Sequence, residues 1–270
     1  MSSLALPRES RCKQLVYQML TNQNKKNTPS CQTCSGRIAW ERAREYGWCK
    51  VCRKKIRPKA HTWFRGSKLS YQQIFLLLHY WQQRQSPGSA RLATGLSYTT
   101  VRRWYWRFRA LVPPDNPAET LSGVVEVDES WFGKRRFGGQ TIVVGAIERD
   151  TKRLKLQVIT DTEQDTLEAF LELHVERTSL VVTDCAGGYN GLSWLGFGHE
   201  TWNHSKGSFA GTNHIESTWS AMKRYLRKLY GCVPTKHIQL ILNEWMARHN
   251  RQSLFTSPTN YLSATLFRIS

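Results

Sequence analysis

The cysteine spacing is the feature that most narrows the folds open to the first part of this sequence. Four of the seven cysteines fall in two C-x2-C pairs with fourteen residues between them: Cys31, Cys34, Cys49 and Cys52. Four thiolates at this spacing can surround one Zn²⁺ tetrahedrally, as in zinc ribbons. The odd total argues against a framework of disulfides. We therefore expect a zinc ribbon with one structural Zn²⁺ over residues 28–60.

The positive charge of the chain is confined to its first 114 residues. The formal net charge is +19. Residues 1–114 contain 22 Lys and Arg against 3 Asp and Glu, whereas residues 115–270 contain 17 of each. A basic part beside a neutral part predicts a polyanion-binding module joined to a unit with another task. A basic surface that only keeps the protein soluble is the alternative.

Hydrophobicity gives no sign of a membrane protein. No apolar run approaches the roughly 18 residues that a spanning helix needs. The first ten residues, MSSLALPRES, lack the charged start and long apolar core of a secretory signal. We therefore expect a cytoplasmic, nucleoid-associated protein that has no membrane partner.

A helix-turn-helix arrangement is predicted between the zinc ribbon and residue 112. A short helix is followed by a Gly-Leu-Ser turn at 95–97, where Ser97 can cap a second helix. The apolar face of that second helix would consist of Val101, Trp104, Tyr105 and Phe108. Its exposed face would carry four arginines that contact bases or phosphates of DNA: Arg102, Arg103, Arg107 and Arg109.

Changes in composition divide the chain into six segments. We expect an N-terminal helix and linker (1–27), the zinc ribbon (28–60), the helix-turn-helix domain (61–112), a Pro-rich linker (113–121), an α/β domain (122–252) and a C-terminal tail (253–270). Within the α/β domain, three successive strands are followed by a helix, two more strands and two helices. This order predicts a mixed sheet covered by helices.

Three acidic residues of the α/β domain point to a catalytic metal site. Asp128 lies near the centre of the first strand, Asp184 ends the fourth, and Glu216 lies on the long helix, two turns before Lys223. A cluster of carboxylates is not stable without a cation, and Mg²⁺ prefers oxygen ligands. Two such ions can activate a nucleophile and stabilise a leaving oxygen in phosphodiester chemistry.

Other readings of the acidic strand and the basic loop after it stay open. Asp128 and Glu126 share a strand face and could form ordinary ion pairs with Arg135 or Arg136. Glu129 would point to the opposite face and act as a salt-bridge or loop residue. The loop itself either tracks DNA or is a solvated hairpin tip; its cations are Lys134, Arg135 and Arg136.

Several segments resemble a known family. VVEVDESWFGKRR, VVTDCAGGY, WNHSKGSFAGTNHIESTWSAMKRYLRK and LNEWMARHN look like the catalytic domain of bacterial insertion-sequence DDE transposases related to the eukaryotic Merlin transposons. The upstream zinc ribbon and helix-turn-helix are similar to that family's front end, so the resemblance covers residues 28–251. It implies a ribonuclease-H-like fold and a protein that cuts and rejoins DNA at transposon ends with Mg²⁺ or Mn²⁺.

The resemblance also implies roles for individual residues. Asp128 and Asp184 would be the first two catalytic acids and Glu216 the third. Lys223 would take the place of the basic residue that contacts DNA phosphate. Some relatives use an asparagine as the third ligand, and Asn213 lies one turn before the glutamate; we favour Glu216 because it carries the negative charge.

The sequence thus predicts a DNA transposase. It would bind double-stranded DNA at the terminal inverted repeats, hydrolyse a phosphodiester to free a 3′-OH, and join that hydroxyl to target DNA. Pairing two ends predicts a homodimer or a larger oligomer on DNA. The alternatives are a metal-dependent ribonuclease-H-like nuclease that cuts without joining, and a transposon-derived DNA-binding regulator.

Overall fold

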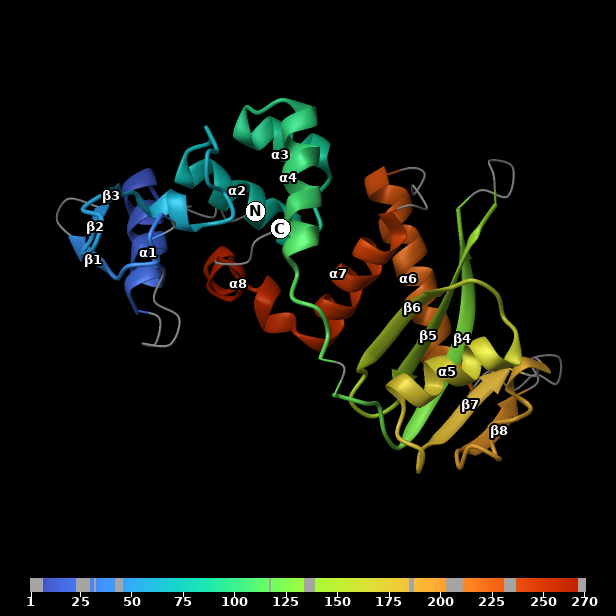
Figure 1. The fold of residues 1–270 in the computed structure, drawn as a ribbon. Coiled ribbons are helices and arrows are strands. Elements are labelled where there is room, and N and C mark those ends of the chain that lie inside the picture. The colour runs from blue at the N-terminus through green and yellow to red at the C-terminus, as the bar shows by residue number, and fades with distance from the viewer. Residues whose placement is uncertain are drawn as a thin grey trace. The chain divides into compact units, whose positions relative to one another are not determined.

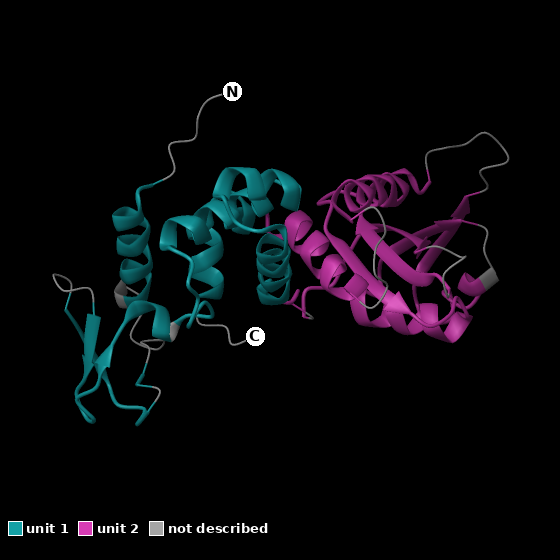
Figure 2. Ribbon diagram, turned by 90° about the horizontal axis from the view of Figure 1, so that it is seen from above, with its two compact units in different colours: residues 1–113, 253–270 teal, residues 114–252 magenta. Residues whose placement is uncertain are grey.

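The computed structural model describes residues 7–22, 30–31, 33–41, 46–116, 118–133, 139–184, 187–202, 211–230 and 237–266. The chain divides into two compact units, as Figure 2 shows. Unit 1 contains residues 1–113 and 253–270, and unit 2 contains residues 114–252. Along the sequence, unit 2 is therefore inserted between two segments of unit 1. Among the described residues, no helix is both long and apolar enough to cross a membrane.

The N-terminal part of unit 1 combines one helix with a small antiparallel sheet. Helix α1 covers Glu9–Asn22, and the sheet consists of strands β1 (Ile38–Glu41), β2 (Tyr46–Cys49) and β3 (Lys55–Ile56) in the order β1-β2-β3 (Figure 1). A small core forms around Ile38, Ile56 and buried cysteines. Tyr17 of α1 meets Trp40 of β1 edge-on, with ring centroids 5.7 Å apart, so α1 packs directly on the sheet.

Three further helices of unit 1 match the predicted helical segments. They are α2 (Tyr71–Gln82), α3 (Pro87–Thr94) and α4 (Tyr98–Leu111). The Ser97 hydroxyl caps α4 by accepting the Thr100 amide at 3.2 Å, and Gly95 makes the preceding turn with a left-handed φ of 67°. The predicted apolar face of α4 is buried throughout: Val101, Trp104, Tyr105 and Phe108.

Two arginines of α4 are not on an exposed face. Arg109 is only 1% exposed, and its guanidinium lies 4.9 Å from the centre of the Trp106 ring. Arg107 is half-buried; it donates to the carbonyl of Trp63 and lies over that residue's ring. The prediction that both side chains face solvent was wrong, because a planar guanidinium can stack on aromatic rings that periodicity alone does not locate.

The last described segment of the chain also differs from the prediction. Residues 253–270 were expected to be a tail, but Pro258–Thr265 form helix α8 in unit 1. Tyr261 of α8 is fully buried, meets Trp81 with ring centroids 5.3 Å apart, and donates its hydroxyl to the carbonyl of Phe108 at 2.5 Å. The aromatic core of the helical domain is thus completed from the far end of the sequence.

Unit 2 is built on a five-stranded mixed sheet. Its strands are β4 (Val124–Phe132), β5 (Thr141–Glu148), β6 (Leu154–Ile159), β7 (Leu180–Asp184) and β8 (Gly198–Trp202). They lie in the order β6-β5-β4-β7-β8, with the β4–β5 and β5–β6 pairs antiparallel and the β4–β7 and β7–β8 pairs parallel. This arrangement confirms the predicted α/β class and is the strand order of a ribonuclease-H-like sheet.

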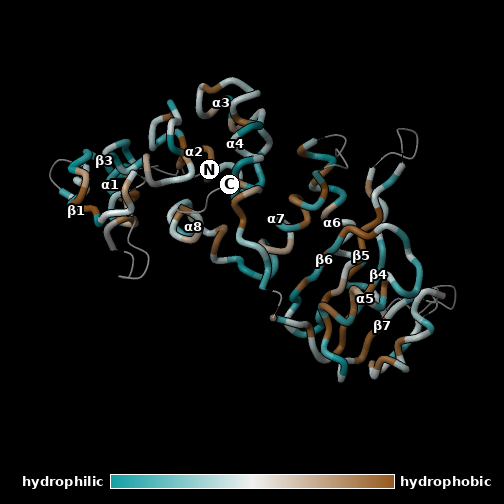
Figure 3. Tube along the Cα trace, in the orientation of Figure 1, coloured by the Kyte–Doolittle hydropathy of each residue, from teal (hydrophilic) through white to brown (hydrophobic). Residues whose placement is uncertain are grey.

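Helices cover both faces of this sheet. Helix α5 (Gln164–His174) packs on the face that carries Val125 and Val127, and Figure 3 shows hydrophobic residues concentrated along these central strands. Helix α6 (Asn213–Tyr230) covers the other face. Close approach of α6 depends on Gly145 of β5, because a Cβ there would lie 2.7 Å from the Trp219 ring.

Helix α7 (Ile238–Asn250) protects the open edge of β6. The Leu154 amide donates to Asn250 Oδ1 at 2.9 Å, and Asn250 Nδ2 donates back to the Leu154 carbonyl at 2.8 Å. Farther along the strand, the Val158 amide donates to Gln239 Oε1 at 3.3 Å. Side chains of α7 therefore satisfy edge groups that would otherwise invite strand pairing. The described chain also has short 3-10 helices at Pro58–His61, Gly187–Tyr189 and Gln252–Phe255.

The burial of α8 predicts that unit 1 depends on Tyr261. Tyr261→Ala should lower the stability of unit 1 by about 3–5 kcal/mol, because it leaves a large cavity beside Trp81. Hydrogen–deuterium exchange at the amides of α2 and α4 measures this stability separately from unit 2. Ala264→Ser, an exposed change on the same helix, should leave exchange within about 0.5 kcal/mol. Unchanged protection in Tyr261→Ala would show that α8 is dispensable.

Candidate active site and metal centre

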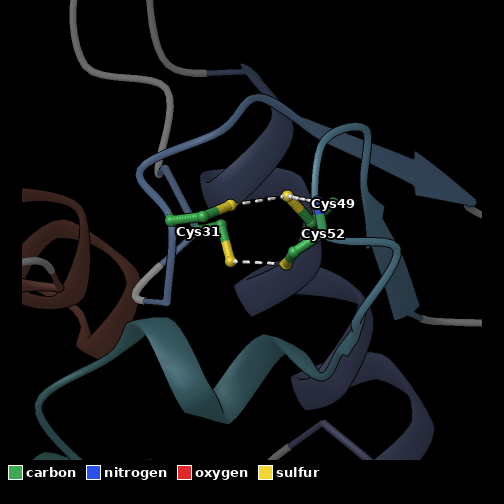
Figure 4. A group of neighbouring side chains, drawn as sticks. Cys31, Cys49 and Cys52 are labelled. Carbon is green, nitrogen blue, oxygen red and sulfur yellow. Dashed lines mark hydrogen bonds between the residues drawn. The ribbon is translucent and has the colours of Figure 1, made fainter.

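The four paired cysteines gather at the end of the small sheet in unit 1. The Sγ atoms of Cys31 and Cys52 are 3.6 Å apart, those of Cys34 and Cys49 are 3.4 Å apart, and all four lie within 4.8 Å of one another. In Figure 4 the labelled cysteines turn their sulfur atoms toward a common centre. A zinc tetrahedron with Zn–S distances of about 2.3 Å has sulfur atoms about 3.8 Å apart. The group therefore suits Zn²⁺.

Both cysteine pairs adopt the same turn. The Ser35 amide donates to the Cys31 carbonyl at 2.7 Å, and the Arg53 amide donates to the Cys49 carbonyl at 3.1 Å. Ser35 and Arg53 have left-handed φ values of 56° and 59°, so the backbone after each cysteine pair turns back over the sulfur atoms of that pair. A hydrogen bond from the Thr33 amide lowers the pKa of Cys31 to about 6, which favours the thiolate that binds metal.

In unit 2, a buried carboxylate on β4 holds the start of α6. Glu126 is fully buried, and its Oε2 accepts the backbone amides of His214 at 2.8 Å and Ile215 at 3.2 Å. Its Oε1 accepts from Arg149 Nε at 2.9 Å and from His214 Nδ1 at 2.7 Å. The carboxylate thereby satisfies two of the free amides at the helix N-terminus, where the macrodipole favours a negative charge.

The partners of Glu126 are fixed in turn. Arg149 also donates through Nη2 to the carbonyl of Gly211, just before α6, at 2.7 Å. Lys152 Nζ lies 2.8 Å from His214 Nε2, which fits a neutral imidazole that accepts there and donates from Nδ1 to the carboxylate. Burial raises the pKa of Glu126, but the hydrogen bonds from these partners outweigh it and hold that pKa below its usual value.

The strand register places the two catalytic aspartates predicted from the sequence on one face of the sheet. In the parallel β4–β7 pair, Glu126 lies opposite Val182. Asp128 and Asp184 each lie two residues beyond this pair, so side-chain alternation places both on the face of Glu126 and Val182. This face is the one that α6 covers, and Trp219 of α6 donates its indole N–H to Asp128 Oδ2 at 3.0 Å.

The three predicted acids influence one another electrostatically. Burial, together with the charges of Asp184 and Glu216, raises the pKa of Asp128 to about 6. Glu216 lies exposed in the first turn of α6, and its Oε1 accepts the Thr212 hydroxyl at 2.8 Å. Among the described residues, only the four cysteines are gathered tightly enough to hold an ion as they stand. The three carboxylates are near one another but do not form a closed ligand set.

Glu129 takes part in this electrostatic cluster from the other face of β4. It is half-buried and accepts a hydrogen bond from the hydroxyl of Tyr189. Burial, with the charges of Asp128 and Asp184, raises its pKa to about 7. The sequence analysis treated Glu129 as a salt-bridge or loop residue; the pair with Tyr189 could not be recognised because the two residues lie sixty positions apart.

The remaining predicted site residues occupy several places. Lys223 is exposed two turns after Glu216, with its Nζ 5.6 Å from the ring of Phe132 at the end of β4. Asn213 is exposed as the first residue of α6. Arg102 and Arg103 are exposed on α4 in unit 1. The three cations of the predicted DNA-tracking loop lie outside the described residues: Lys134, Arg135 and Arg136.

Comparison with known sequences agrees with this geometry. The sequence profile of the ISXO2-like transposase domain matches residues 120–250. The prediction of a transposase catalytic domain is thereby confirmed, and a transposase domain of this type implies transposition as the process it serves. No curated protein matches the chain.

Solved structures similar to the chain include retroviral integrases. The catalytic core of BIV integrase is 18% identical, covers 48% of this chain and 85% of its own, and has a TM-score of 0.35. The HTLV-2 integrase catalytic core in complex with magnesium is 11% identical, with coverages of 54% and 96% and a TM-score of 0.35. A simian T-cell lymphotropic virus intasome in complex with PP2A regulatory subunit B56 gamma is 10% identical, with coverages of 72% and 76% and a TM-score of 0.37.

The cysteine geometry predicts about one zinc ion per chain. Cys49→Ser should lose most of this zinc, because a hydroxyl is a poor substitute for a thiolate ligand. Elemental analysis of the freshly purified protein measures the content. Cys12→Ala is the matched control, since Cys12 is a buried cysteine outside the cluster, and it should retain the metal. Wild-type protein without zinc would contradict the assignment.

The raised pKa of Asp128 predicts an unusual gain in stability on neutralisation. The pKa of this carboxyl is about 6 in the folded protein and 3.8 ordinarily. The folded protein therefore keeps its full stability while the carboxyl is protonated, below pH 4, and loses part of it as the pH rises through 6. Without added divalent cations, Asp128→Asn should therefore raise the unfolding free energy at neutral pH by about 1–2 kcal/mol.

Thermal unfolding between acidic and neutral pH, with and without Mg²⁺, measures this effect. The gain should vanish toward pH 4, and Mg²⁺ should stabilise the wild type more than the variant. The control is Asp150→Asn, at an exposed turn of the same unit, which should show neither effect. A gain that persists at low pH would disprove the electrostatic origin.

Proposed function

We propose that the protein is a DNA transposase that binds the terminal inverted repeats of its element, cleaves a phosphodiester at each end and joins the freed 3′-OH to target DNA. The observation that supports this most is that Asp128 contacts the helix that carries Glu216 and is acted on by the charges of both Asp184 and Glu216. The relation to Merlin transposons remains a prediction from the resemblance.

The acids of this face have the chemistry of a divalent metal site. The charge of Asp184 adds to the cost of ionising Asp128, and a cation bound there would remove that cost. A donor set made only of carboxylate oxygens suits Mg²⁺ or Mn²⁺. We infer that Asp128, Asp184 and Glu216 hold such ions, with Asn213 as the alternative third ligand. Two bound ions would supply charge stabilisation to the attacking and departing oxygens of phosphodiester transfer.

Side chains around the acids have supporting roles in this proposal. The indole N–H of Trp219 donates to Asp128 Oδ2 and would thereby fix the orientation of the carboxylate toward a metal ion. The exposed ammonium of Lys223, beyond Glu216 on the same helix, would bind a DNA phosphate near the reacting bond. The basic unit 1, with its zinc ribbon and α4, would bind the element ends. Pairing two ends requires a homodimer or larger oligomer on DNA.

Strand transfer with pre-cut element ends tests the proposal. Oligonucleotides carrying the inverted repeats that flank the gene should be joined to plasmid DNA in the presence of Mg²⁺ or Mn²⁺. Asp184→Asn and Glu216→Gln should lower this activity at least about 100-fold, because each removes a charge that stabilises the transition state. Asp150→Asn serves again as the matched control and should retain activity.

Each contrary outcome would indicate a different function for the protein or a different active site. Cleavage of intact ends without any joining of pre-cut ends would indicate a nuclease. End binding that neither cleaves nor joins would indicate a DNA-binding regulator. Full activity of Asp184→Asn would place the active site elsewhere. If Asn213→Ala abolishes joining while Glu216→Gln does not, the asparagine is the third ligand.

A further inference from the structure

Two cationic hollows on unit 1 share lining residues, and no residue of α4 lines either of them. The first has a volume of about 340 Å³, and its walls carry four cations and two tyrosines: Lys13, Lys55, Arg57, Lys59, Tyr46 and Tyr71. The second has a volume of about 480 Å³, and its cations are Lys54, Lys55, Arg57 and Arg65. Lys55 and Arg57 line both hollows. Among the described residues, no Asp or Glu lines either one.

The walls of the first hollow hold their ammonium groups in place. Lys55 Nζ lies 3.9 Å from the centre of the Tyr46 ring, and Lys59 Nζ lies 4.8 Å from that of Tyr71. Lys59 Nζ also donates to a backbone carbonyl in the turn before α2. These contacts restrict two flexible side chains before any ligand arrives, so less conformational entropy is lost on binding.

One acid, Glu9, lines neither hollow, although its charge acts on the wall cation Lys59. Glu9 of α1 caps helix α2, because its two carboxylate oxygens accept the amides of Tyr71 at 3.0 Å and Gln72 at 2.6 Å. Its charge is therefore directed to the helix N-terminus. Lys55, Arg57 and Lys54 remain exposed on and beside β3, with their cationic ends accessible to an anionic ligand.

We propose that the two hollows form a phosphate clamp that holds consecutive phosphates of one DNA strand without reading sequence. A pair of hollows that share Lys55 and Arg57 fits a repeating anion better than a single small one, because both shared cations lie between two binding positions. The inference rests on the proposed function only in taking DNA as the polyanion. Sequence discrimination would remain with Arg102 and Arg103 of α4.

The test compares the salt dependence of DNA binding between the full-length wild-type protein and its variants. Fluorescence anisotropy is measured with a duplex of arbitrary sequence, roughly three helical turns long, and with an element-end duplex, over a range of KCl concentrations. Lys55→Gln combined with Arg57→Gln should make the slope of log K against log [KCl] shallower by about 2, at about 0.9 for each lost phosphate contact. The affinity for both duplexes should fall by the same factor, so the ratio of the two affinities stays constant.

Two matched variants separate a clamp from general charge attraction. Lys50→Gln with Lys68→Gln removes the same charge from exposed positions that line neither hollow, and its slope should equal that of the wild type. Lys55→Arg with Arg57→Lys keeps the cations in the hollows and should restore most of the lost slope. Zinc content and thermal unfolding of each variant show that unit 1 is folded.

The outcomes distinguish this inference from the proposed function. An unchanged slope in the first double variant, or an equal loss in the Lys50 and Lys68 variant, overturns the clamp even if strand transfer succeeds. A reduced slope on the arbitrary duplex supports the clamp even if no joining is found. Tighter binding of an RNA duplex of the same sequence, with the same loss in the variant, would overturn the choice of DNA.

Discussion

The buried carboxylate of Glu126 is the interaction on which the geometry of unit 2 depends. An ionised side chain without exposure costs several kcal/mol unless donors surround it. Here two backbone amides of α6, the Arg149 guanidinium and the His214 imidazole all donate to it. The same contacts fix where α6 begins and which of its faces meets the sheet. Trp219 then reaches Asp128, and the charge of Glu216 acts on the same carboxylate.

A carboxylate that caps a helix from another element is used twice in this chain. Glu9 of α1 holds the start of α2 in unit 1, as Glu126 of β4 holds the start of α6 in unit 2. In both units the cap lies beside the surface assigned to a ligand. At Asp128, by contrast, burial and the charges of Asp184 and Glu216 outweigh the hydrogen bonds and raise the pKa to about 6. One acid of β4 is therefore structural, whereas we propose that the next one along the same face binds a cation.

Local patterns in the sequence predicted most of the fold. The cysteine spacing located the four-cysteine group, and hydrophobic periodicity located the strands of unit 2 and most of the helices, because these signals depend on neighbouring residues. Long-range partners were not predictable. Glu126 was considered as a partner of Arg135 or Arg136, yet it binds Arg149 and the start of α6. The packing of α8 likewise depends on an aromatic contact between distant segments, Trp81 and Tyr261.

A crystal structure of the full-length protein with Mn²⁺ tests the central claim most directly, because anomalous scattering locates the manganese ions. The account predicts manganese between the oxygens of Asp128, Asp184 and Glu216, two ions about 3.5–4 Å apart when DNA is bound, with Glu126 still hydrogen-bonded to the start of α6. Manganese bound elsewhere, or an α6 released from Glu126 while the acids bind metal, would contradict it.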